Sequence, residues 1–177
     1  IDGDIELSGA SVQFLSSMPV VKETRAYIKF DKENFNAFIS DGHSEHLKIS
    51  RTSVLISGLD KYDQIANITV NIDGTLEDKL AYLNRKPLEY ASAIGIDTKT
   101  IQGFAETELK LSFIVENKLT LDDIQISSRS KVVEIKASNV WLSNDITDGE
   151  IQVELNKEGM DVSGRVKIGT IPVELTW

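Results

Sequence analysis

The chain has 177 residues, no cysteine and a net charge of −9. The absence of cysteine excludes a disulfide framework, a zinc ribbon and a cysteine nucleophile. The acidic charge argues against nucleic acid as a partner, because such binding needs a basic patch that displaces counterions. The composition, 41% hydrophobic and 27% charged, is typical of a folded chain, and we expect 1–177 to form a single β-rich domain.

The beginning of the chain suggests that it is part of something longer. No apolar run is long enough for a transmembrane helix or a signal peptide. The first residue is Ile1 rather than methionine. We therefore expect an internal fragment whose anchoring and targeting segments lie elsewhere.

Apolar residues alternate with polar ones in five segments of the first 74 residues. A period of two predicts strands with one buried face. The segments with this pattern are 4–9, 26–30, 34–40, 46–50 and 65–74.

The pattern changes between residues 75 and 95, where apolar residues recur with a helical period. Leu76, Leu80 and Leu83 predict one short helix, with Thr75 as its N-cap. Leu88, Ala91 and Ile94 predict a second, which starts near Pro87 and ends at Gly95.

Strands resume at 105–115, 121–130 and 131–142, and the closing run 150–177 alternates most regularly. In that run the NKEG loop should let Gly159 adopt positive φ, and Gly169–Thr170 suits a two-residue type II′ turn. These turns set Leu155 opposite Met160, Val153 opposite Val162, Ile168 opposite Ile171, Val166 opposite Val173 and Gly164 opposite Leu175. On the other face Arg165 falls opposite both Glu150 and Glu174, and Glu154 falls opposite Asp161.

Clusters of potential metal ligands or acid–base groups are few. His43, Glu45 and His46 lie beside Asp41, and a divalent metal accepts these ligand types. No further ligand is marked elsewhere, so we interpret this stretch as a solvated loop and expect no metal. The acidic pairs Asp122–Asp123 and Asp145–Asp148 sit where aspartate is ordinary turn chemistry, so we expect no catalytic residue and no enzyme.

Two further features have ordinary structural explanations. The stretch SGRVKIG gathers Arg165 and Lys167 between glycines, but Val166 and Ile168 alternate with them, which predicts a strand rather than a phosphate loop. Trp141 and Trp177 could be ligand platforms, although core or edge-covering roles are more common for tryptophan. We expect no cofactor.

The predicted strands greatly outnumber the helices that could cover them. We expect about a dozen strands, and two helices of about 14 Å cannot cover that much sheet. The sheet could close as a sandwich or barrel, stack on further copies, or curl into a trough for acyl chains.

The order of these elements resembles the AsmA-like superfamily of bacterial envelope proteins, most closely its YhdP/TamB-type members. The resemblance covers Ala66–Trp177. It rests on a strand ending in GTLEDKL, a helical pair with PLEYASAIGID, then IQGFAETELKLSF, LTLDDIQI and the closing DGEIQVELNKEGMDVSGRVKIGTIPVELTW.

The resemblance implies a mainly β fold: a curled antiparallel sheet, or taco-like groove, with two short helices near its middle. It implies a segment of an inner-membrane-anchored periplasmic bridge that moves phospholipid and supports outer-membrane integrity. Its partners would be phospholipid acyl chains, adjacent β repeats of the same chain and other envelope proteins. The residues expected to contact acyl chains are Ile68, Val70, Ile72, Leu109, Leu111, Phe113, Ile151, Val153, Leu155, Val162, Val166, Ile168, Ile171, Val173 and Leu175.

Two other hypotheses remain beside lipid transport. One is a non-catalytic structural or protein-interaction β domain of an envelope scaffold, with a closed core filled by side chains. The other is a hydrolase acting through paired carboxylates, which would require carboxyl groups of separated pKa in one cleft.

Overall fold

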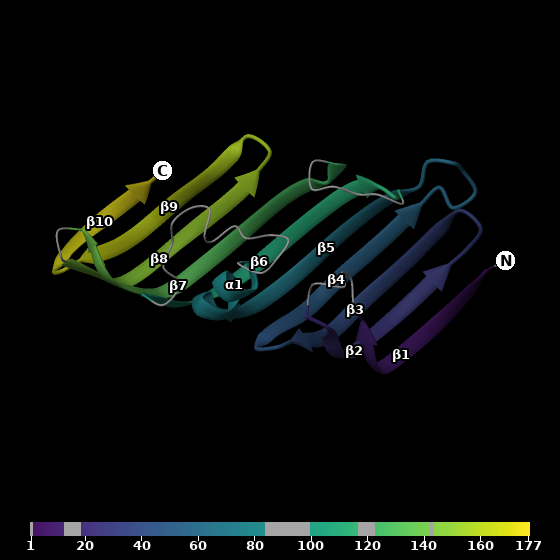
Figure 1. Ribbon diagram of the computed structural model, residues 1–177, viewed down its shortest axis with the longest axis horizontal. Coiled ribbons are helices and arrows are strands. Elements are labelled where there is room, and N and C mark those ends of the chain that lie inside the picture. The colour runs from purple at the N-terminus through teal and green to yellow at the C-terminus, as the bar shows by residue number, and fades with distance from the viewer. Residues whose placement is uncertain (1, 13–18, 84–99, 117–122, 142–143) are drawn as a thin grey trace.

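Ten antiparallel strands form one sheet, and their order in space follows their order in the chain (Figure 1). The computed structural model describes residues 2–12, 19–83, 100–116, 123–141 and 144–177. The first five strands are β1 (Gly3–Val12), β2 (Val21–Phe30), β3 (Asn34–Ser44), β4 (Leu47–Ser57) and β5 (Ile65–Thr75). After helix α1 (Leu76–Leu83) come β6 (Ile101–Ile114), β7 (Gln125–Trp141), β8 (Asn144–Asn156), β9 (Gly159–Ile168) and β10 (Ile171–Thr176).

The sheet is open, because β1 and β10 pair only with their inner neighbours. The two chain ends therefore lie at opposite ends of the row of strands (Figure 1). The mainly β, antiparallel prediction is confirmed. The sheet is uncurled, however, so the predicted curl into a groove is not confirmed.

The described part of the chain holds ten strands rather than about a dozen, partly because two predicted strands are one. The segments predicted at 121–130 and 131–142 join in β7. The inward positions change parity there, from Val132 to Ile135, where the register with β8 also shifts. This phase change mimics a strand boundary in the sequence, but it is a bulge inside a continuous strand.

Similar bulges interrupt several other strands. Glu23, Arg51, Glu134 and Asp148 have φ between 42° and 56°, and each lies at or beside a register shift. A bulge places an extra residue in one strand and reverses the alternation beyond it. It therefore keeps the apolar residues on one side of the sheet where the simple period of two fails.

The predicted register of the closing strands is confirmed. All the predicted pairs occur, from Leu155 with Met160 to Gly164 with Leu175. Gly169 has φ 61° and Gly159 has φ 150°, as their turns require. The first turn is tighter than predicted, because Asn156 pairs with Gly159 and leaves only Lys157 and Glu158 in the loop.

The first predicted helix is confirmed as α1. Its N-cap is Thr75, whose Oγ1 accepts a hydrogen bond of 3.1 Å from the Asp78 N–H. Glu77 and Asp78 stand in the first turn, where negative charge is favourable. The second predicted helix lies outside the described residues.

Candidate functional site: an apolar sheet face

The sheet has one continuous apolar face, and all the residues predicted to contact acyl chains lie on it. Residues paired across strands point to the same side, as do alternate residues within one strand. Ile68 pairs with Leu111, and Val70 with Leu109. The register continues the same face through β7 to β10.

Most of this face is only partly covered by protein. Among the predicted residues Val166 is buried, at 3% exposure, whereas Leu155 is 39% and Ile171 is 65% exposed. The others are intermediate. Such a broad, partly exposed apolar surface is unusual for a protein that acts alone in water, and typically marks a binding surface.

The same face extends into the first four strands, which the predicted site omitted. Ile28 pairs with Ile5 and with Ala37, and Val54 joins Ala37 to Ile68. The alternation in residues 4–9, 26–30, 34–40 and 46–50 was visible in the sequence. Only the register, however, shows that these side chains share a face with β5 to β10.

The opposite face is mainly polar and carries a network of ion pairs. Arg129 meets Glu154 at 2.9 Å, Lys131 meets Glu150 at 2.9 Å, and Arg165 meets Glu174 at 3.1 Å. Hydrogen bonding to Glu150 raises the pKa of Lys131. Exposed Tyr27, Phe38 and Leu55 interrupt the polar character of this face in the first half of the sheet.

Helix α1 covers only part of the apolar face. It contacts β5 and β6. Leu76 packs against a small core of Ala105, Val132 and Ile135. Ile151 and Val153 border the same core, so these two predicted lipid contacts have protein neighbours.

The helix also brings a cation to the apolar face, which the sequence interpretation missed. Lys79 is only 9% exposed. Its Nζ donates to the Ile72 carbonyl at 2.7 Å and to Thr107 Oγ1 at 2.8 Å. Burial lowers the pKa of Lys79 to about 8, while Asp73 and Glu106 oppose this effect. The helical spacing from Leu76 was the available signal, since residues three apart share a helix face.

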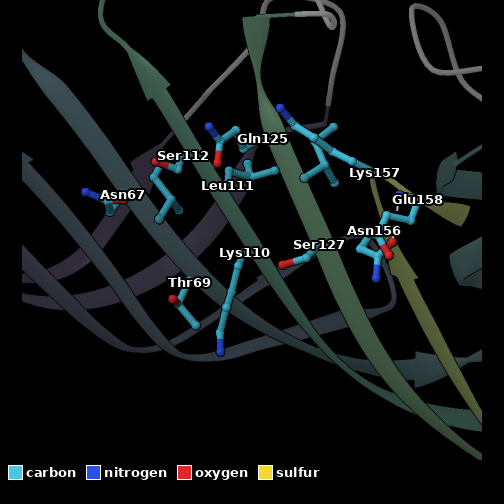
Figure 2. Close-up of a pocket in the computed structure, with 12 residues that line it drawn as sticks. Asn67, Thr69, Lys110, Leu111, Ser112, Gln125, Ser127, Asn156, Lys157 and Glu158 are labelled. Atoms are coloured by element: carbon cyan, nitrogen blue, oxygen red, sulfur yellow. Dashed lines mark hydrogen bonds between the residues drawn. The ribbon is translucent and has the colours of Figure 1, made fainter.

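A shallow hollow of about 510 Å³ spans β5, β6, β7 and the turn between β8 and β9 (Figure 2). Two predicted residues, Ile68 and Leu111, line it together with Ile126. The amide, hydroxyl and charged groups in its lining belong to Asn67, Thr69, Lys110, Ser112, Gln125, Ser127, Asn156, Lys157 and Glu158.

Residues of the weaker candidate sites have ordinary ion-pair or hydrogen-bond partners in the structure. His43 Nδ1 lies 3.6 Å from Glu23 Oε2. No group of three or more potential metal ligands converges among the described residues. A hydrogen bond from Lys167 lowers the pKa of Asp148, the opposite of what a general acid needs. Asp122 lies outside the described residues.

The basic stretch in the closing run and the tryptophans can also be placed. Residues 163–168 of SGRVKIG lie in strand β9, as predicted, with Arg165 paired to Glu174 and Lys167 paired to Asp148. Glu150 is opposite Arg165 in register but forms its ion pair with Lys131. Trp177 is 72% exposed, and its backbone exchanges two hydrogen bonds with Val162. The side chain of Trp141 lies outside the described set.

Comparison with known proteins found no match: no family model, no curated protein and no solved structure matches this chain. In the described part of the chain, no helix is long and apolar enough to cross a membrane.

Proposed function

We propose that this chain is a groove-forming segment of a bridge-like phospholipid transport protein, whose apolar sheet face guides acyl chains. In this proposal the segment lies in the periplasm, belongs to an inner-membrane-anchored protein and supports outer-membrane integrity. The observation that carries the proposal is the continuous apolar face of an open ten-stranded sheet, left partly exposed next to α1.

A continuous apolar face suits flexible acyl chains. Apolar burial is non-directional and gains about 25 cal/mol for each Å² removed from water. Side chains such as Leu155 and Val162 therefore suit acyl chains of mixed length and saturation. The ion-paired opposite face, with Arg129 and Glu154, keeps that side of the sheet in water.

The open sheet edges fit the predicted partners. Strands β1 and β10 each have a neighbour on one side only. Their free backbone groups can pair with strands from adjacent β repeats of the same chain. We include in the proposal that the sheet curls around its lipid, with the bulges near Glu134 and Asp148 as the bending points.

The proposal predicts that the purified chain retains phospholipid and exchanges it for a fluorescent acyl probe. Native mass spectrometry followed by lipid extraction measures the first property, and fluorescence titration measures the second. Leu155→Asp adds a charge to the apolar face at a position already 39% exposed, so the fold should tolerate it. We expect this variant to bind the probe about tenfold more weakly, because burying a carboxylate against acyl chains is unfavourable.

The matched control is Gln152→Asp, on the same strand but on the polar face. Gln152 pairs with Lys131 and Ser163 and is exposed. This variant should bind the probe like the unmodified chain. Equal losses in both variants, or a chain without lipid or probe binding, would contradict the proposal.

A second candidate is a non-catalytic structural or protein-interaction β domain of an envelope scaffold. The packed cluster of Ala105, Val132 and Ile135 beneath Leu76 favours it locally, since this part of the face already has protein cover. A protein-filled face would leave the acyl probe unbound and would make Leu155→Asp silent in the titration.

A further inference from the structure

Among the described residues, Lys79 places an ammonium group on a face whose other side chains are mainly apolar or hydroxyl-bearing. The group is nearly buried, at 9% exposure. It donates to the Ile72 carbonyl and to Thr107 Oγ1, and Thr107 in turn shares a 2.9 Å hydrogen bond with Ser130. The two protein acceptors are neutral, so neither compensates the charge.

The charge of Lys79 has no carboxylate partner on its own side of the sheet. None lies within ion-pair distance in the part of the chain that the structure describes. Asp73 and Glu106 influence its pKa, but they alternate with Ile72 and Thr107 and therefore point to the opposite face. An ammonium has three N–H donors, and only two have acceptors in the described protein.

Rows of apolar side chains run across the strands from the position of Lys79. Thr107 and Ser130 form a polar pair, and the same row of paired residues continues through Val153 to Val162. The neighbouring row leads through Leu109 to Leu155 and Met160. An anionic group beside Lys79 and this polar pair could therefore have its acyl chain lying along either row.

We propose that Lys79 binds the anionic group of an amphiphile, a phosphate or a carboxylate, whose acyl chain lies on the apolar face. This inference rests on the proposed function. It assigns Lys79 to the polar end of the ligand, which the apolar residues cannot recognise. A charge-assisted hydrogen bond to the third N–H would also compensate a cation that burial disfavours.

The test compares three probes of equal chain length: a fluorescent fatty acid, the corresponding phosphatidic acid and the corresponding fatty alcohol. We expect the unmodified chain to bind at least one anionic probe about tenfold more tightly than the alcohol. Lys79→Met should lose this preference and keep its affinity for the alcohol. Lys79→Arg keeps the charge and should preserve most of the preference.

Lys48→Met is the control, since Lys48 is exposed and pairs in register with Asp73 on the polar face. It should bind all three probes like the unmodified chain. Preference for the phosphate alone assigns a lipid headgroup, and equal preference for the carboxylate extends the site to free fatty acids.

Two different failures can be told apart. An anionic preference that survives in Lys79→Met, with circular dichroism showing an intact fold, overturns the assignment of Lys79 but leaves acyl binding standing. If the unmodified chain binds the alcohol as tightly as the anionic probes, the assignment of Lys79 is likewise overturned and acyl binding still stands. Absence of binding for all three probes contradicts the proposed function itself.

Discussion

Lys79 places a nearly buried charge between helix α1 and the apolar face of the sheet. Its desolvated ammonium is costly, and two neutral hydrogen bonds offset only part of that cost. A hydrophobic residue at this helix position would cover the sheet more favourably. The lysine therefore indicates a role beyond packing. Probe-binding titrations of Lys79 variants test this role.

The lowered pKa of Lys79 predicts a pH-dependent stability. The pKa is about 8 in the folded chain and 10.5 in its ordinary state. Between these values the unfolded chain binds more protons, so the free energy of unfolding should rise with pH. After allowance for solvent screening we expect a gain of roughly 1–2 kcal/mol between pH 7 and pH 10.5, measured relative to Lys79→Met by urea unfolding.

The comparison with Lys79→Met isolates this residue from other groups that titrate in the same range. The difference between the two proteins should be constant below pH 7 and should change only through the stated window. Lys48→Met should follow the unmodified chain throughout. A flat difference for Lys79→Met would show that the ammonium is solvated rather than buried.

Single residues were the hardest feature to predict from the sequence. The N-cap at Thr75 was predictable because capping depends on neighbouring residues. The contacts of Lys79 were not, because they join α1 to β5 and β6 across the chain. A cation on the apolar face could not be predicted for the same reason.

At the scale of strands, β8 to β10 were predictable because two short turns set their register. Gly159 and Gly169 fix where each hairpin turns, and the alternation then determines which residues share a face. The bulges in β2, β4, β7 and β8 were not predictable. Their positive-φ residues are two glutamates, one arginine and one aspartate, and of these only aspartate is enriched in that backbone conformation.

The β8–β9 hairpin offers a prediction with an internal control. Gly164 and Gly159 have nearly the same φ, 152° and 150°. A Cβ at Gly164 would meet the Glu150 carbonyl oxygen and would lie 2.6 Å from Ile151 Cα, whereas a Cβ at Gly159 meets nothing within 4 Å. Both alanine variants carry the backbone strain, but only Gly164→Ala also forces β8 and β9 apart.

We therefore expect Gly159→Ala to lower the free energy of unfolding by about 1 kcal/mol, and Gly164→Ala by a further 1–3 kcal/mol. Chemical denaturation of both variants measures the difference. Equal losses would mean that the two strands can separate at Gly164 without penalty, and that the close approach between them contributes nothing to the hairpin.

For the whole molecule, the fold class and the two-faced character were predictable, but the shape was not. Alternation places apolar side chains such as Val70 and Leu109 on one face whatever the sheet does. Closure, curl and the number of strands depend on long-range pairing and on bulges, which a period of two does not encode. The open sheet leaves that apolar face as the main feature to explain.

The most direct test of acyl-chain binding locates the lipid on the sheet. The chain has no cysteine, so single-cysteine variants can carry an environment-sensitive fluorophore. Val162 and Ser163 are neighbours on β9 with opposite orientations, Val162 on the apolar face and Ser163 on the polar face. Added phospholipid should shift the emission to shorter wavelength and reduce aqueous quenching at Val162→Cys, with no change at Ser163→Cys. An unchanged Val162→Cys signal, or equal changes at both positions, would contradict lipid binding by the apolar face.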